Sequence, residues 1–370
     1  MQRRHFLQGL GALAMLGMAP ALARVTPAKP LYFDGLSFLP EDLNDIRASK
    51  LDGYICDISA IEEVKQPDGS VNYKRTYNAC MKSIKAALER VQDNPGLLRL
   101  GRTAADLEQA RSNHQCALYF QIQGADCVEE RLDQVDEFHD LGLRVLQLTH
   151  HYGNRYAGGA LDKDAKGLSR DGLALIELLN ARNMLIDLSH SAVPTALDAI
   201  RASKAPVVQS HGACRAIVNN ARCSPDQVIR AIADSGGVFG VFMMSFWLTN
   251  DAVPGTEHFI AQLRHVAKVG GMDAVAIAND YPLRGQKNLL ALGNDNAEGV
   301  KQYLDWWRMQ GQRGILGFDR EPVHVVIPEL NHIERFERID QALARAGFKG
   351  GERERILGGN WQRVLGQVLV

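Results

Sequence analysis

Eight short apolar runs, separated by segments long enough to form a helix, constrain the fold of this chain more than any other feature. The runs occupy residues 31–35, 53–58, 116–122, 143–148, 184–188, 207–210, 237–243 and 274–278. Helix-start signals lie between them, for example Ser224-Pro225-Asp226 before an apolar-periodic segment. Strands that alternate with helices in this way favour a parallel sheet covered by helices.

Two architectures satisfy this alternation, a closed barrel and an open doubly wound sheet. Eight such units favour the barrel. The open sheet would need a glycine-rich phosphate loop after its first strand, and Asp34-Gly35-Leu36-Ser37-Phe38 is no such loop. We therefore predict an α/β fold, a (β/α)8 TIM barrel, with additional C-terminal helices over residues 329–370. Residues 157–167 and 283–320 are expected to be long loops.

The N-terminal segment predicts export. Gln2-Arg3-Arg4-His5-Phe6-Leu7-Gln8 has the twin-arginine pattern, and an apolar run over residues 10–18 leads to Ala21-Leu22-Ala23. The run is too short to span a bilayer, which takes about 20 residues. We predict a signal peptide over residues 1–23, cleaved near Ala23, a periplasmic protein delivered by the twin-arginine export machinery, and a single barrel domain over residues 24–370.

Composition narrows the choice of partners. The formal net charge of −1 gives no electrostatic reason to bind nucleic acid or an anionic membrane surface. Six cysteines show no CxxC spacing, which argues against a structural zinc ribbon. Cys56 and Cys116 lie inside apolar runs, where we expect buried free thiols.

Two neighbouring runs end in the same dipeptide. Ser189-His190 follows the fifth run and Ser210-His211 follows the sixth. Parallel strands joined by a helix end at the same edge of the sheet, so both imidazoles should emerge there. Histidine is the commonest side-chain ligand of zinc, which makes this pair a candidate metal site. A histidine at a strand end can also serve only to hydrogen-bond the neighbouring backbone.

Several segments in this order and spacing resemble the membrane (renal) dipeptidase family of zinc metallopeptidases, which have amidohydrolase-type barrels. The resemblance extends from about Asp34 to the C-terminus. Its carrying segments are Asp187-Leu188-Ser189-His190, Ser210-His211, Ile229-Arg230-Ala231-Ile232-Ala233, Ala276-Ile277-Ala278-Asn279-Asp280-Tyr281 and Gly358-Gly359-Asn360-Trp361-Gln362-Arg363-Val364-Leu365.

The resemblance implies roles for five residues. His190 and His211 match the family's histidine ligands of one zinc ion. His150 matches the residue that polarises the substrate carbonyl, and Arg222 the residue that holds the substrate's C-terminal carboxylate. Asp280 matches the carboxylate that handles protons.

Three further positions depart from the family pattern. Leu36 and Phe38 stand where the family has a His-x-Asp ligand pair, and Gln123 stands where it has a bridging glutamate. Leucine and phenylalanine offer no lone pair, and a neutral amide oxygen is a weak zinc ligand. The sequence therefore predicts at most one zinc ion per chain, held by His190 and His211, with Gln123 as a weak contributor and Asp280 as an alternative third ligand.

The predicted function is a metal-dependent hydrolase that cleaves the amide bond of a small dipeptide-like substrate. The alternative is a catalytically silent member of the same family that binds a small carboxylate ligand in the periplasm. Family members are often dimers, so the resemblance also implies a possible homodimer.

Overall fold

The computed structural model describes residues 29–65, 71–285 and 297–370 of the 370-residue chain. The predicted signal peptide and part of the predicted loop at 283–320 lie outside these residues. Within the described ranges, no helix combines the length and the apolar character needed to cross a bilayer. All six cysteines are buried and free, as expected for Cys56 and Cys116.

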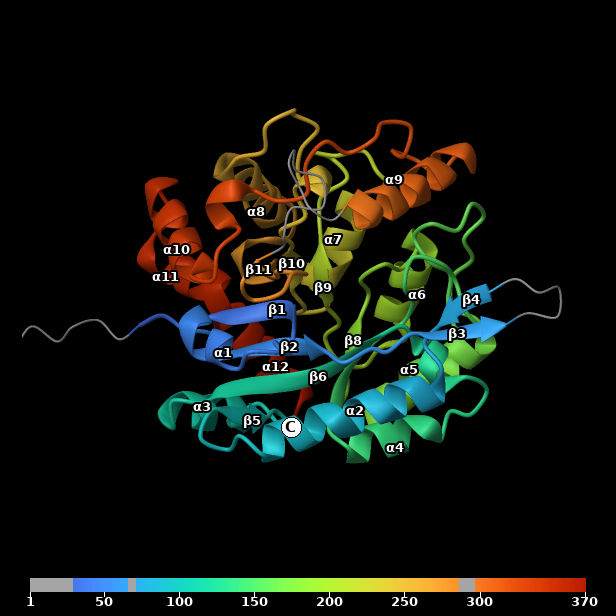
Figure 1. The fold of residues 1–370 in the computed structure, drawn as a ribbon, viewed down its shortest axis with the longest axis horizontal. Coiled ribbons are helices and arrows are strands. Elements are labelled where there is room, and N and C mark those ends of the chain that lie inside the picture. Colours follow the sequence, from blue (N-terminus) through green and yellow to red (C-terminus); the bar gives the residue numbers. More distant parts are fainter. Residues whose placement is uncertain (1–28, 66–70, 286–296) are drawn as a thin grey trace, which may run out of the picture.

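Two parallel sheets form the centre of the molecule (Figure 1). Each of the eight predicted apolar runs overlaps one of their strands. The larger sheet has the order β1 (Phe33–Phe38), β2 (Gly53–Asp57), β6 (Cys116–Gln123), β7 (Leu143–Gln147) and β8 (Leu185–Asp187), with β5 (Leu98–Leu100) also paired to β6; the smaller has the order β11 (Val275–Ile277), β10 (Phe239–Val241) and β9 (Gln209–Gly212).

Backbone hydrogen bonds connect both edges of the smaller sheet to the larger one. At one edge, the Leu188 N–H donates to the Val208 carbonyl at 2.8 Å, and the Val208 N–H donates to Ile186 at 3.0 Å. At the other edge, the N–H groups of Asn279 and Asp280 donate to the Leu36 carbonyl at 3.3 and 2.9 Å. The protein is therefore an α/β protein with a curled parallel sheet.

Helices cover the outside of this sheet (Figure 1). Local sequence explains where two of these helices begin, since the Thr76 side chain accepts a hydrogen bond from the Ala79 N–H and the Ser169 side chain accepts one from the Gly172 N–H. Their bounds are α1 (Asn44–Ser49), α2 (Tyr77–Gln92), α3 (Ala105–Ser112), α4 (Gln134–Asp140), α5 (Arg170–Ala181), α6 (Val193–Ala202), α7 (Asp226–Asp234), α8 (Thr256–Gly270), α9 (Ala297–Gln312), α10 (Arg335–Arg345), α11 (Gly350–Glu354) and α12 (Asn360–Val368).

Shorter elements connect these units. An antiparallel hairpin, β3 (Glu62–Lys65) and β4 (Val71–Lys74), follows β2 and was not expected from the apolar pattern. Short helical turns are η1 (Ala125–Val128), η2 (Ser245–Trp247), η3 (Met272–Ala274), η4 (Pro328–Leu330) and the π-helical η5 (Arg355–Gly359). The helices α10 to α12 confirm the predicted helical character of residues 329–370.

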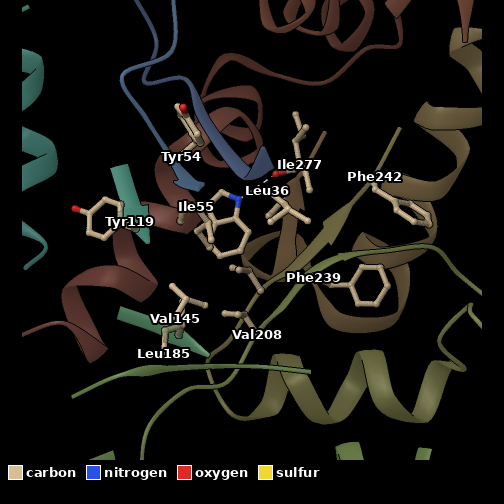
Figure 2. Packing of buried hydrophobic residues seen from close by; sticks show 14 of the residues in the cluster. Leu36, Tyr54, Ile55, Tyr119, Val145, Leu185, Val208, Phe239, Phe242 and Ile277 are labelled. Carbon is tan, nitrogen blue, oxygen red and sulfur yellow. Dashed lines mark hydrogen bonds between the residues drawn. The ribbon is translucent and has the colours of Figure 1, made fainter. Parts of the chain in front are cut away.

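The interior of the curled sheet is apolar. Side chains from successive strands meet there, including Ile55, Val145, Leu185 and Val208, all essentially buried (Figure 2). The C-terminal helices seal one side, because the Trp361 indole is buried and its Nε1 donates to the Ile277 carbonyl at 3.2 Å. This close packing holds the ends of the strands in place, and therefore also the polar side chains that follow them.

Candidate active site

A cluster of four histidines lies where β7, β8 and β9 end. His150 and His151 follow β7, His190 follows β8, and His211 is in β9. The Nε2 atoms of His190 and His211 are 2.8 Å apart, so the two Ser-His dipeptides do bring their imidazoles together. The ring centroids of His150 and His190 lie 4.4 Å apart in a stacked arrangement.

His151 is the residue of this cluster to which the sequence analysis assigned no role. Its Nδ1 lies 3.1 Å from the Nδ1 of His190. Its ring centroid is 4.4 Å from that of His150 and 4.5 Å from that of His190. Its backbone φ of 60° places it in the left-handed region, which turns the side chain back toward the strand ends. Adjacency to His150 was the only sequence signal.

A buried carboxylate orders the His211 side of the cluster. Asp187, at the end of β8, accepts from the side chains of Ser189 (2.7 Å), Ser210 (2.5 Å) and Gln121 (2.6 Å) and from the backbone N–H groups of Ser189 and Ser210. The Ser210 Oγ lies 2.8 Å from Nδ1 of His211. Ser210 therefore links Asp187 to the His211 imidazole, and the Ser189 Oγ accepts from the His211 backbone N–H at 3.0 Å, so both serines fix the orientation of His211.

All four histidines are held in the neutral form. Burial lowers the pKa of His150, His190 and His211 well below 6.5, and that of His151 to about 3. The charge of Arg222 lowers all four values further. Neutral imidazole is the form that binds a metal ion.

Arg222 lies beside the histidines. Its side chain is buried, its guanidinium stands over the Phe242 ring at 5.2 Å, and Nη2 donates to the His211 carbonyl at a long 3.5 Å. Burial lowers its pKa, and the Asp280 carboxylate opposes this effect. Among the residues that the structure describes, this long contact is the one side-chain hydrogen bond found for the guanidinium, which leaves donors for a ligand carboxylate.

Asp280 follows β11 and has a left-handed backbone φ of 56°. It is half-buried, and its backbone N–H donates to the Leu36 carbonyl. Burial raises its pKa to about 7, the carboxylates of Asp57 and Asp187 add to the rise, and Arg222 opposes it. A carboxyl group with a pKa near neutrality can both accept and release a proton at physiological pH.

The three positions that depart from the family pattern lie in different surroundings. Leu36 is fully buried in the apolar interior (Figure 2), and Phe38 is half-buried at the end of β1. Gln123 ends β6, and its Nε2 donates to Asp57 Oδ2 at 2.7 Å. Gln123 therefore binds a neighbouring carboxylate in the protein.

Arg75 is a second cation that the sequence analysis did not single out. A Cβ added at Gly124 would lie 3.6 Å from the Arg75 Cδ and 3.8 Å from the His150 Cβ, so the arginine stem approaches the histidines past Gly124. Its Nε is buried and has no hydrogen-bond partner within the described part of the chain. It also lines a cavity of about 430 Å³ together with Asp126 and Asn154.

The predicted loop at 283–320 contains a helix that covers the cluster. The Trp306 ring of α9 (orange in Figure 1) lies 5.1 Å from the His151 ring, and Tyr303 packs against Trp306 at 5.8 Å. The loop assignment was therefore wrong for Ala297–Gln312, a helix in which Tyr303, Trp306 and Trp307 pack against one another.

Part of the histidine cluster has the arrangement of a metal site. One ring nitrogen from each of His150, His151 and His190 lies within 4.8 Å of the others. An all-imidazole donor set suits zinc or another transition metal better than magnesium or calcium. A largely buried cluster of neutral imidazoles at the strand ends of an α/β fold, with an arginine and a near-neutral carboxyl beside it, is a candidate metal centre of the kind that amidohydrolase-like proteins have.

Comparison with known proteins identifies the family. Residues 33–304 match the family model described as membrane dipeptidase (peptidase family M19), and the chain belongs to this family. Dipeptidase verJ of Clonostachys rogersoniana is 30% identical over 202 residues, which are 54% of this chain and 50% of that protein. The chain thus spans about half the length of this curated relative.

Solved structures show the same fold. An amidohydrolase from Pseudomonas aeruginosa superimposes with a TM-score of 0.75 at 22% identity, over 92% of this chain and 96% of that one. A metallo peptidase from Rhodobacter sphaeroides, liganded with a phosphinate mimic of the dipeptide L-Ala-D-Ala, gives 0.71 at 17% identity, over 92% of this chain and 100% of its own.

Proposed function

We propose that this protein is a periplasmic, metal-dependent hydrolase that cleaves the amide bond of a small dipeptide-like substrate. The observation that carries the proposal is the convergence of five side chains from the ends of β7, β8, β9 and β11, namely His150, His190, His211, Arg222 and Asp280. Membership of the membrane dipeptidase family supports the reaction class. The Rhodobacter protein's dipeptide-mimicking ligand supports the substrate class.

Each residue has a role that its surroundings support. Arg222 would bind the substrate carboxylate, because its guanidinium is buried and weakly bonded. Asp280 would take a proton from the attacking water and return it to the leaving amine, because its pKa of about 7 suits both steps. His150 would lie beside the scissile carbonyl and stabilise its developing charge.

We propose that one metal ion serves this site. The His190 and His211 imidazoles fit such an ion, and His151 is a third neighbour, because the two ring nitrogens of His190 lie close to His211 and His151. When bound, the ion would lower the pKa of a water molecule to about 7. A second ion is disfavoured because Leu36 and Phe38 have no donor atoms and the Gln123 amide is bonded to Asp57.

The remaining features of the proposal concern the whole protein. Both edges of the smaller sheet meet the larger one, which supports a closed (β/α)8 barrel in a single domain over residues 24–370. The twin-arginine pattern supports export to the periplasm with cleavage near Ala23. A homodimer remains part of the proposal by family resemblance.

Metal content and dipeptide turnover test the proposal together. Purified protein should contain about one zinc ion per chain and hydrolyse a panel of dipeptides, and His190→Ala should abolish both. His139→Ala, on α4 away from the cluster, is the matched control and should change neither. If the protein binds a dipeptide but does not hydrolyse it, whether or not it contains metal, the proposed enzymatic activity is wrong. That result would favour the alternative, a periplasmic binding protein.

A further inference from the structure

Arg75 has a fixed position beside the histidine cluster, in the short segment between β4 and α2. Immediately before it, β4 pairs with β3, and immediately after it, Thr76 caps α2. Gly124 leaves open a space that the Arg75 stem and the His150 side chain both border, since a Cβ added there would lie 3.6 Å from the Arg75 Cδ and 3.8 Å from the His150 Cβ. The arginine therefore reaches the end of β7 from outside the two parallel sheets.

The protein leaves a donor of this arginine free. The Arg75 Nε is buried and has no hydrogen-bond partner among the residues that the structure describes. Its charge acts on the carboxyl groups of Asp57 and Asp126. Asp57, however, accepts from the Ser59 hydroxyl at 2.6 Å and from the Gln123 amide at 2.7 Å, and burial disfavours the ionised form of Asp126 by raising its pKa. A buried cationic donor in this state is costly unless a ligand completes its hydrogen bonds.

A cavity of about 430 Å³ lies beside Arg75. Small-molecule sites usually have volumes of about 300–1,000 Å³. Asn154, in the wall of this cavity, donates from Nδ2 to the Leu148 carbonyl at 2.8 Å, which ties the wall to the segment that carries His150. The cavity therefore adjoins the histidine cluster, and Arg75 belongs to both.

Two arginines flank the histidines. The charge of Arg222 lowers the pKa of His211, and the charge of Arg75 lowers that of Asp126. Both charges lower the pKa of His150, which lies between them. A dipeptide whose C-terminal carboxylate is bound by Arg222 would therefore present its first residue to Arg75.

We propose that Arg75 binds a second carboxylate of the substrate, so that the enzyme prefers dipeptides whose first residue is glutamate or aspartate. The acidic side chain would extend past Gly124 into the cavity. A guanidinium suits this role because its planar N–H groups can bond both oxygens of one carboxylate. The inference rests on the proposed function and deepens it by naming the class of dipeptide.

Two matched dipeptides test this preference. Glutamyl-alanine and glutaminyl-alanine have nearly the same size and differ by one charge, so the ratio of their kcat/KM values reports recognition of the side-chain carboxylate. The ratio would be measured, with alanine of either configuration, for wild type, Arg75→Met, Arg75→Lys and Arg155→Met. Arg155 is the matched control, because it lines the same cavity but is already paired with Asp171 at 2.6 Å. Circular dichroism would verify that each variant is folded.

We expect wild type and Arg155→Met to prefer the glutamyl peptide by about 10- to 100-fold, as for loss of a hydrogen bond to a charged group. Arg75→Met should bring the ratio close to one, and Arg75→Lys should give an intermediate ratio because it keeps the charge. A ratio near one in wild type, or a ratio that Arg75→Met leaves unchanged, would overturn the inference.

Binding measurements separate this inference from the proposed function. Both peptides would be titrated calorimetrically into Asp280→Asn, with and without Arg75→Met. Tighter binding of the glutamyl peptide that depends on Arg75, in a protein whose wild type cleaves neither peptide, would overturn the proposed function alone. Equal turnover of the two peptides by wild type would overturn the inference alone.

Discussion

The raised pKa of Asp280 predicts a stability effect that depends on pH. The folded carboxyl group titrates near 7, whereas the unfolded group titrates near 3.8. Between these values the folded protein holds a proton that the unfolded chain has lost, so the free energy of unfolding decreases as the pH rises through this window. Asparagine cannot ionise, and Asp280→Asn should therefore lack this decrease.

The rise from 3.8 to about 7 corresponds to about 4 kcal/mol. Because Asp280 keeps partial contact with solvent, we expect about half of this, ~2 kcal/mol. Metal-free Asp280→Asn should thus be more stable than wild type by ~2 kcal/mol at about pH 8 and by close to zero at about pH 3, below the pKa of the unfolded carboxyl group. The same substitution should lower dipeptide turnover by 10²- to 10⁴-fold or so, because the proton acceptor is lost.

Urea denaturation of the metal-free proteins at both pH values measures the difference. The buried Asp34, whose pKa burial also raises to about 7, is present in wild type and variant alike and does not contribute to it. The exposed Asp164→Asn is the matched control and should give no pH-dependent change. A stability difference that is the same at both pH values, or a variant less stable than wild type at the higher one, would refute the reasoning.

Three further predictions concern the surroundings of the histidines. Arg222→Met should raise KM for a dipeptide by about 10- to 100-fold through loss of a charge-assisted hydrogen bond, with Arg222→Lys intermediate; equal KM in all three proteins would show that the carboxylate binds elsewhere. Ser210→Ala removes the hydrogen bonds that connect Asp187 to His211 and should weaken metal binding by about 10- to 100-fold in equilibrium dialysis. Unchanged affinity would show that this connection does not contribute to metal binding. Arg75→Met should raise the pKa of His151, because a nearby positive charge is removed; a histidine NMR titration of the metal-free protein measures it, and a lower value would contradict the placement of Arg75.

The site was partly visible in the sequence because some of its residues belong to the strands themselves. Ser189-His190 and Ser210-His211 end buried runs, so strand periodicity and parallel pairing were enough to bring the imidazoles to one edge. Arg75 directly follows the hairpin β3–β4, and Trp306 lies in the helix α9; both segments lie outside the two parallel sheets. Such segments acquire their position by packing, which has no local signature in the sequence.

By itself, the sequence determined the eight strands, their parallel direction and the edge at which His190 and His211 emerge, because alternation and strand length are local properties of the chain. Only the tertiary structure decided that His151 turns into the cluster, that Gln123 binds Asp57, and that burial raises the pKa of Asp280 to about 7. These features depend on distances between residues remote in sequence and on exclusion of water, and both arise only when the strands and helices pack together.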